Sequence, residues 1–433
     1  MGADMSARSF KARMVRIAGA LVAAGLATAL PERASAEGLR GAFALPDNDR
    51  EWIGVVPELS RDLLDWTEDP NGTALKLLRG RADDTLRTGR GYVHAQIQAA
   101  RMIERTNVAG RFPILSRLPN QHGDGTENTE DVVHRGQVAA TAVLPFVTLF
   151  GEAIYTETLY RDDDMWDVRR AFAVIGDLDR FPVYLKVGRD FVDFGHMGAT
   201  NPFLPSMNWH YFHTQSDAPV VSLGYADRGI EASATWIPEG RHKRVAASGG
   251  PNFALDASYR RALRPGLEVE VGAGYLHDTI YDTIEPHHLV DQRAGQETMR
   301  NGAANLRGAV RYDAGEAGRF EALAEFTRTI EAWPATDWAV SALTVQGKWS
   351  GHLRGVPVAL SASYGRGVQG APGTEWERME QFALGAEVEL TPLARLQAEY
   401  VFNTGFAPLI AITRASDASV EAHSWSVGAT VGF

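Results

Sequence analysis

The chain has 433 residues, a formal net charge of −11 at pH 7 and no cysteine. A chain without cysteine has neither a disulfide framework nor a thiolate metal site. After residue 36 there is no run of 18 consecutive apolar residues, which excludes a helical membrane protein. Hydrophobic residues make up 45% of the sequence. This share fits either a soluble domain or a transmembrane barrel, in which only every second residue faces lipid.

Residues 1–36 have the three parts of a secretory signal peptide. Lys11, Arg13 and Arg16 give a basic start, Ile17 to Leu30 is apolar, and residues 34–36 are the small residues of a cleavage site. The apolar part is too short to span a bilayer. We therefore predict that this segment directs export and is removed.

Residues 37–90 differ from the chain that follows. One short helix is predicted from Pro57 to Trp66, followed by a break at Asn71-Gly72, and a second covers 74–86. No sustained heptad is present, so a coiled coil is not predicted. A periplasmic lead-in segment and a small plug both fit this composition.

From Gly91 onward the chain alternates apolar and polar residues in segments of roughly ten, the pattern of transmembrane strands. In one segment Val269 and Val271 alternate with Glu268 and Glu270. Sixteen such strands are predicted, near 91–104, 132–143, 147–160, 168–175, 182–190, 219–225, 229–238, 252–261, 267–276, 302–312, 319–329, 337–349, 356–365, 379–390, 394–404 and 421–433. The predicted fold is therefore an all-β, antiparallel transmembrane barrel over residues 91–433, preceded by a short helical segment.

The connections between these strands alternate between short turns and longer loops. Pro145, Pro265 and Pro392 lie in short turns, whereas the connections at 191–218 and 277–301 are long. Short turns at one rim and long loops at the other are typical of outer-membrane barrels, and the C-terminal Phe433 resembles the aromatic end of such proteins. We predict a protein of the bacterial outer membrane, in contact with lipid and lipopolysaccharide.

Residues 191–218 form the third long loop of the predicted barrel. The segment is aromatic and carries few charges, which favours packing over disorder. In sixteen-stranded porins, which this chain resembles in strand and loop count, the third loop folds into the barrel and narrows it. The predicted constriction residues are Phe191, Asp193, Phe194, His196, Phe203, Trp209, His210, Tyr211 and His213. The three histidines lack the spacing of a metal site, so no metal or cofactor is predicted.

A basic group lies on the strands near this loop. Its members are Arg135, Arg169, Arg170, Lys186 and Arg189. Such a group is expected either to attract an anionic solute into the pore or to form part of a self-paired lumen wall, since both signs of charge face the predicted lumen. Acidic runs in the external loops, such as Asp162 to Asp164, are expected to be solvated or to share divalent ions with lipopolysaccharide.

A more specific resemblance rests on the strand before the third loop. Val187-Gly188-Arg189 followed by Phe194-Gly195, and Thr214 leading into 220–225, resemble the LbtU family of siderophore porins. That family shows a V-G-[RQ]-x-x-x-P-F-G segment here, and Asp193 stands where proline is usual. The similarity is clearest over about 130–240. The resemblance implies an outer-membrane channel that admits ferric siderophores.

Three functions compete at this point. The first is a passive or selective pore for small solutes, assembled as a homotrimer by analogy with sixteen-stranded porins. The second is a barrel enzyme of the lipase or protease type, against which stands the absence of a Gly-x-Ser-x-Gly elbow. The third is a structural or adhesin barrel that acts through its loops. We predict the pore, with no catalytic residues and no nucleic-acid partner.

Overall fold

The computed structural model describes residues 53–65, 72–113, 125–158, 166–216, 218–238, 251–282, 299–406 and 417–433. The predicted signal peptide and the acidic run at 162–164 lie outside these residues. No helix among the described residues has the length and apolarity needed to cross a bilayer.

Sixteen antiparallel strands form a closed barrel, which confirms the predicted fold. Each strand pairs with the next, and β17 pairs with β2 to close the sheet. The strands are β2 (Gly91–Thr106), β3 (Glu127–Leu144), β4 (Val147–Tyr155), β5 (Trp166–Ile175), β6 (Val183–Arg189), β7 (Val220–Asp227), β8 (Ile230–Ile237), β9 (Asn252–Arg264), β10 (Leu267–Leu276), β11 (Ala303–Asp313), β12 (Arg319–Thr329), β13 (Ser341–Leu353), β14 (Val356–Val368), β15 (Met379–Thr391), β16 (Ala394–Phe406) and β17 (Asp417–Gly432). A two-residue strand, β1 (Ile53–Gly54), pairs in parallel with the start of β2.

The two faces of the sheet differ as the alternation predicts. Large apolar side chains are exposed on the outer face, for example Val138, Val271 and Leu306 at 57%, 60% and 63%. Polar side chains such as His94 and Gln98 are buried on the inner face. An outward apolar band suits hydrocarbon, and closure leaves no strand edge with unpaired backbone groups in lipid.

The rims are unequal. Two-residue turns join β3 to β4, β7 to β8, β9 to β10, β13 to β14 and β15 to β16. Arg228 and Gly229 form one of these turns, both with positive φ, the geometry of a type I′ hairpin turn. Residues 190–219, which connect β6 to β7, form a long loop at the opposite rim, as predicted.

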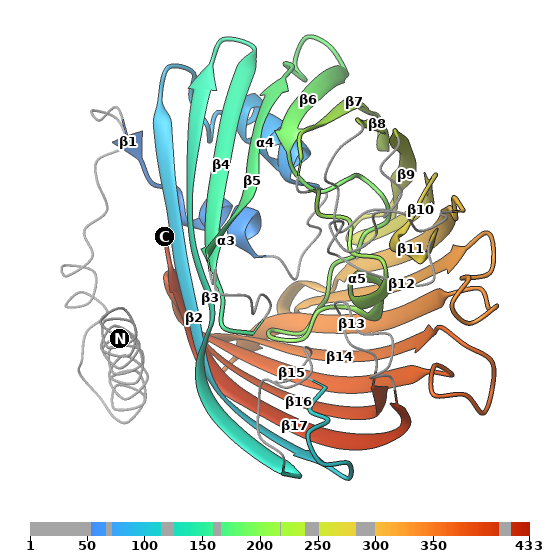
Figure 1. Cartoon of the computed structure of the whole chain (residues 1–433). Helices are drawn as coiled ribbons and strands as arrows, with labels where there is room; N and C mark the ends of the chain where they lie inside the picture. Colours follow the sequence, from blue (N-terminus) through green and yellow to red (C-terminus); the bar gives the residue numbers. More distant parts are fainter. Residues whose placement is uncertain are drawn as a thin grey trace, which may run out of the picture.

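Three helices lie inside the ring of strands (Figure 1). The predicted N-terminal helices are α3 (Pro57–Leu64) and α4 (Thr73–Ala82). The third is α5 (Met207–Tyr211), within the third loop. Two short 3-10 turns, η2 (Ile280–Asp282) and η4 (Gly315–Ala317), complete the elements of the described residues. The lumen therefore contains these helical segments of the same chain as well as side chains from the wall.

Candidate functional site

The third loop leaves the wall as a closed excursion with a paired stem. Phe191 and Gln215 form an isolated antiparallel bridge, and Val192 N donates to Thr214 O at 2.9 Å. At the far end of the excursion, Ser206 accepts from Trp209 N at 3.1 Å and caps α5. A serine oxygen at this position satisfies an N–H group that the helix leaves unpaired. The stem and the capped helix give the loop a defined shape inside the lumen.

Carboxylates on three well-separated strands bind the backbone of the loop. Their acceptor contacts are Asp256 with Gly195 N at 2.8 Å, Glu325 with His196 N at 2.7 Å and Met197 N at 3.0 Å, and Glu399 with Phe203 N at 3.0 Å and Leu204 N at 3.1 Å. Charge-assisted bonds of this kind are about twice as strong as neutral ones. Because the strands are β9, β12 and β16, the loop is fixed across the lumen from its root on β6.

A buried charge cluster holds the root of the loop. Lys186 Nζ lies 2.8 Å from Asp190 and 2.9 Å from Asp193, and it donates to Phe191 O at 3.2 Å. Ser222 Oγ donates to the second oxygen of Asp193 at 2.8 Å. Asp193 therefore ties the loop to both flanking strands.

Gly188 is required by close packing at the same root. Its φ is +141°, and a Cβ there would stand 2.3 Å from the carbonyl oxygen of Ala171 on β5. Only glycine tolerates both the backbone angle and the approach. The geometry of the strand pair thus explains why a glycine occupies position 188.

Aromatic side chains from other long connections cover the loop. Tyr281 Oη donates to Tyr211 O at 2.8 Å. The Trp333 ring, which is fully buried, packs 5.6 Å from Tyr281 and 5.2 Å from Trp376. This aromatic cluster also contains Phe212, 5.6 Å from Tyr281. On its long-loop side, the third loop is therefore covered by a packed apolar layer.

The remaining predicted loop residues divide between this layer and the lumen beneath. Trp209 lies 4.1 Å from His213 in an edge-to-face arrangement, and the His210 ring lies 5.3 Å from that of Tyr211. Phe203 packs at the far wall with Val401 and Met102. Asp193, Phe194 and His196 line a cavity, described below. The nine residues are therefore near one another only in part.

The five predicted basic residues are engaged with the protein itself. Arg135 donates to Gln98 at 2.6 Å and to Pro202 O at 3.2 Å. Arg169 and Arg170 share Glu152: Arg169 lies 3.7 Å from it and over the rings of Phe191 and Trp209, and Arg170 also donates to Leu63 O at 2.6 Å. Lys186 holds the loop root, and Arg189 pairs with Asp167 at 2.9 Å. None of the five lines the cavity. Their contacts position the third loop and the N-terminal helices.

A bulge explains why two consecutive arginines both face inward. The pairing of β4 with β5 shifts so that Glu152 opposes Arg170 while Ala153 opposes Val168. The extra residue, Arg169, is left outside the ladder, and such a bulge re-aims a side chain. Strict alternation along a strand would place only one of the two arginines in the lumen. The sequence alone therefore does not show that Glu152 contacts both.

A cavity of about 540 Å³ lies between the third loop, α4 and strands β8 to β13. Most of the charged wall side chains that line it form ion pairs with one another: Arg307 with Asp256 at 2.6 Å, Arg311 with Glu268 at 3.1 Å and Glu270 at 2.9 Å, Arg260 with Glu270 at 3.0 Å, and Arg319 with Glu321 at 2.6 Å. Burial lowers the pKa of His196, so its ring adds no positive charge at neutral pH. The cavity offers many hydrogen-bonding groups with little net charge.

Several lining residues were missed in the sequence. Asp256, Arg260 and Lys348 lie on inward-facing positions and line the cavity. The signal was available, because Asp256 and Arg260 alternate with the outward Leu255 and Tyr259. The contribution of α4 to the lining had no such signal.

The comparisons with known proteins agree on the fold. No family model and no curated protein matches this sequence. Similar solved structures include an anion-selective porin from Comamonas acidovorans (11% identity, TM-score 0.52, 79% of this chain and 99% of that chain), OprB of Pseudomonas putida at high pH (11%, 0.54, 79% and 94%) and OmpF of Salmonella typhi in complex with daunomycin (13%, 0.51, 79% and 97%). The fold is that of an outer-membrane porin-like β-barrel.

Proposed function

We propose that this protein is a pore for small polar solutes in the outer membrane, with the third loop as its constriction. The observation that carries the proposal is the loop's path across the lumen, fixed by carboxylates on β9, β12 and β16. A sixteen-stranded barrel is wide enough for an aqueous channel. A loop bound to the far wall reduces that width to a filter.

The basic residues support a structural role in this pore. Four of them, Arg135, Arg169, Arg170 and Lys186, are buried, and each binds a wall residue, the loop or a helix. The self-paired lumen wall is therefore the interpretation that we adopt for this group. The residues that contact the solute are instead the paired charges that line the cavity, such as Arg307 and Arg311.

Ferric siderophores are the specific solutes that the family resemblance suggests. Support comes from the strand before the loop, where Gly188 and Arg189 keep the family pattern, whereas Asp193 in the loop departs from it. The volume of the cavity is within the range that holds drug-sized molecules. We propose siderophores as one solute class alongside sugars and amino acids.

Reconstitution tests the pore directly. The mature chain in planar bilayers is expected to give discrete conductance steps, and proteoliposomes are expected to swell in sugars and amino acids. Faster swelling with a ferric siderophore than with a sugar of similar size would identify the finer substrate class. A folded barrel that gives neither steps nor swelling would contradict the pore.

We also propose a homotrimer, by analogy with sixteen-stranded porins. The three pores of a trimer are identical by symmetry and insert as one particle. Each insertion event is therefore expected to give one conductance increase that closes in three equal steps. Single steps only, together with a monomer mass in light scattering, would exclude this assembly.

A further inference from the structure

The inward face of β2 to β6 is unusual for the wall of an aqueous channel, which is polar. It carries buried apolar side chains: Tyr92, Ala139, Val143, Phe150, Phe172, Val174 and Tyr184. Exposed to water, this patch would be costly, since each large apolar side chain gains roughly 1.5–3 kcal/mol on burial. The patch therefore requires an occupant.

Helices α3 and α4 supply that occupant. They present the apolar residues Leu59, Leu63, Leu64, Ala74, Leu75, Leu77 and Leu78, which form one buried cluster with the wall patch. Leu64 and Leu77 are completely buried. Two complementary apolar surfaces thus meet within one chain.

Wall side chains also satisfy the end of α3. The last carbonyl groups of a helix lack internal partners. Leu64 O accepts from Gln137 at 3.0 Å and from Gln96 at 3.3 Å, and Leu63 O accepts from Arg170 at 2.6 Å. These three donors lie on β3, β2 and β5, so side chains of the wall hydrogen-bond the C-terminal carbonyl groups of α3.

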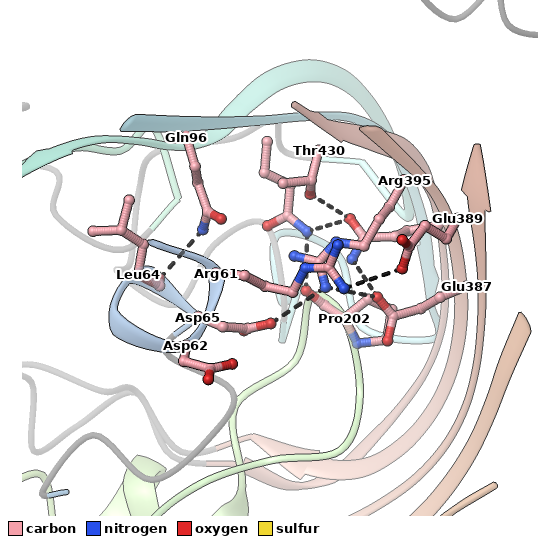
Figure 2. Close-up of polar contacts among 12 residues, drawn as sticks. Arg61, Asp62, Leu64, Asp65, Gln96, Pro202, Glu387, Glu389, Arg395 and Thr430 are labelled. Carbon is pink, nitrogen blue, oxygen red and sulfur yellow. Dashed lines mark hydrogen bonds and ion pairs between the residues drawn. The ribbon is translucent and has the colours of Figure 1, made fainter. Parts of the chain in front are cut away.

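Ion pairs connect the helices to other sectors of the barrel (Figure 2). Arg61 lies 3.0 Å from Glu389 and also donates to Pro392 O at 3.0 Å. Asp65 lies 3.4 Å from Arg395. Pro392 belongs to the turn between β15 and β16, which places α3 near the short-turn rim.

Helix α4 faces the open part of the lumen. Arg79 pairs with Glu231 on β8, and Leu75, Lys76 and Arg79 line the cavity. One side of the cavity is therefore helix, and the opposite side is the charged wall of β9 to β13.

We propose that α3 and α4 form a resident plug, which fills the β2–β6 side of the lumen and confines solutes to the β8–β13 side. This inference rests on the proposed pore function and adds a second determinant of its size limit. The third loop limits passage at one level, and α4 limits it nearer the short-turn rim.

The first test replaces residues 57–82 by a Gly/Ser linker of equal length. Freeing occupied cross-section is expected to raise single-channel conductance by about twofold or more and to admit larger sugars in swelling assays. An unchanged conductance and size limit in a folded barrel would overturn the plug. If neither the native chain nor the linker variant conducts, both the pore and the plug are overturned. If the native chain conducts, the comparison with the linker variant tests the plug alone.

The second test does not depend on the folding of the linker variant. Because the native chain has no cysteine, Leu77→Cys introduces a single thiol, on the buried face of α4. It is expected to resist a polar thiol reagent in the folded barrel, while the control Asp83→Cys, at the exposed end of the same helix, reacts. Equal, rapid labelling of both thiols would show that α4 does not occupy the wall and would overturn the proposal.

Discussion

At the scale of single residues, buried charges in this lumen hold chain segments in place. Lys186 forms ion pairs with two carboxylates at the root of the third loop, and Glu325 accepts hydrogen bonds from two successive backbone N–H groups of the loop. A buried charge that loses its partner is strongly destabilised, whereas an exposed pair contributes little. Substitutions at these residues therefore separate positioning from solute contact.

Lys186→Met is expected to lower the free energy of unfolding by about 3–5 kcal/mol, because Asp190 and Asp193 are left without their shared cation. Burial already raises the pKa of Asp190. Urea unfolding of the refolded barrel measures the change. The control Arg105→Met, whose side chain and that of its partner Glu127 are 60% and 66% exposed, is expected to cost about 1 kcal/mol or less. Equal costs would contradict the root cluster.

Gly367 on β14 makes room for α5. A Cβ at this position would lie 2.1 Å from the ring of Tyr211. Gly367→Ala is therefore expected to displace the loop helix and to change single-channel conductance. Gly308→Ala is the control, since its Cβ would meet an ordinary contact at 3.7 Å. If both variants conduct like the native chain, the packing of α5 does not set the constriction.

At the scale of elements, the alternation of apolar and polar residues predicted the strands. It did not predict how segments of the chain pack inside the lumen. All sixteen strands were predicted because the outer face must be apolar in lipid. The third loop was identified by its aromatic residues, such as Trp209 and Tyr211. Its wall contacts were not predictable, since Glu325 and Glu399 bind backbone amides, which leave no pattern in the sequence.

The charged wall of the cavity makes a prediction about selectivity. Because its basic groups are paired with carboxylates, the native pore is expected to show weak preference between small cations and anions. Arg311→Gln leaves Glu268 and Glu270 with fewer positive partners and is expected to shift the reversal potential in a salt gradient toward cations. Arg228→Gln, in an exposed turn, serves as the control. A strongly anion-selective native pore would contradict the paired wall.

At the scale of the whole molecule, the barrel encloses two segments of its own chain. Helix α5 of the third loop lies against β12 to β14, and α3 and α4 lie on the side of β2 to β6 (Figure 1). Apolar residues on the inner face of β4 and β5, such as Phe150 and Phe172, were a signal for the second segment. That signal was ambiguous in the sequence, because a strand that is apolar on both faces also fits a soluble core.

We expect the third loop to constrict the pore, so a deletion within the loop should change the single-channel conductance. Removing residues 198–213 takes away α5 and the contacts of Phe203 and Leu204 with Glu399. In planar bilayers the folded deletion variant is expected to conduct more than the native chain and to admit larger solutes. Unchanged conductance and an unchanged size limit would contradict the claim.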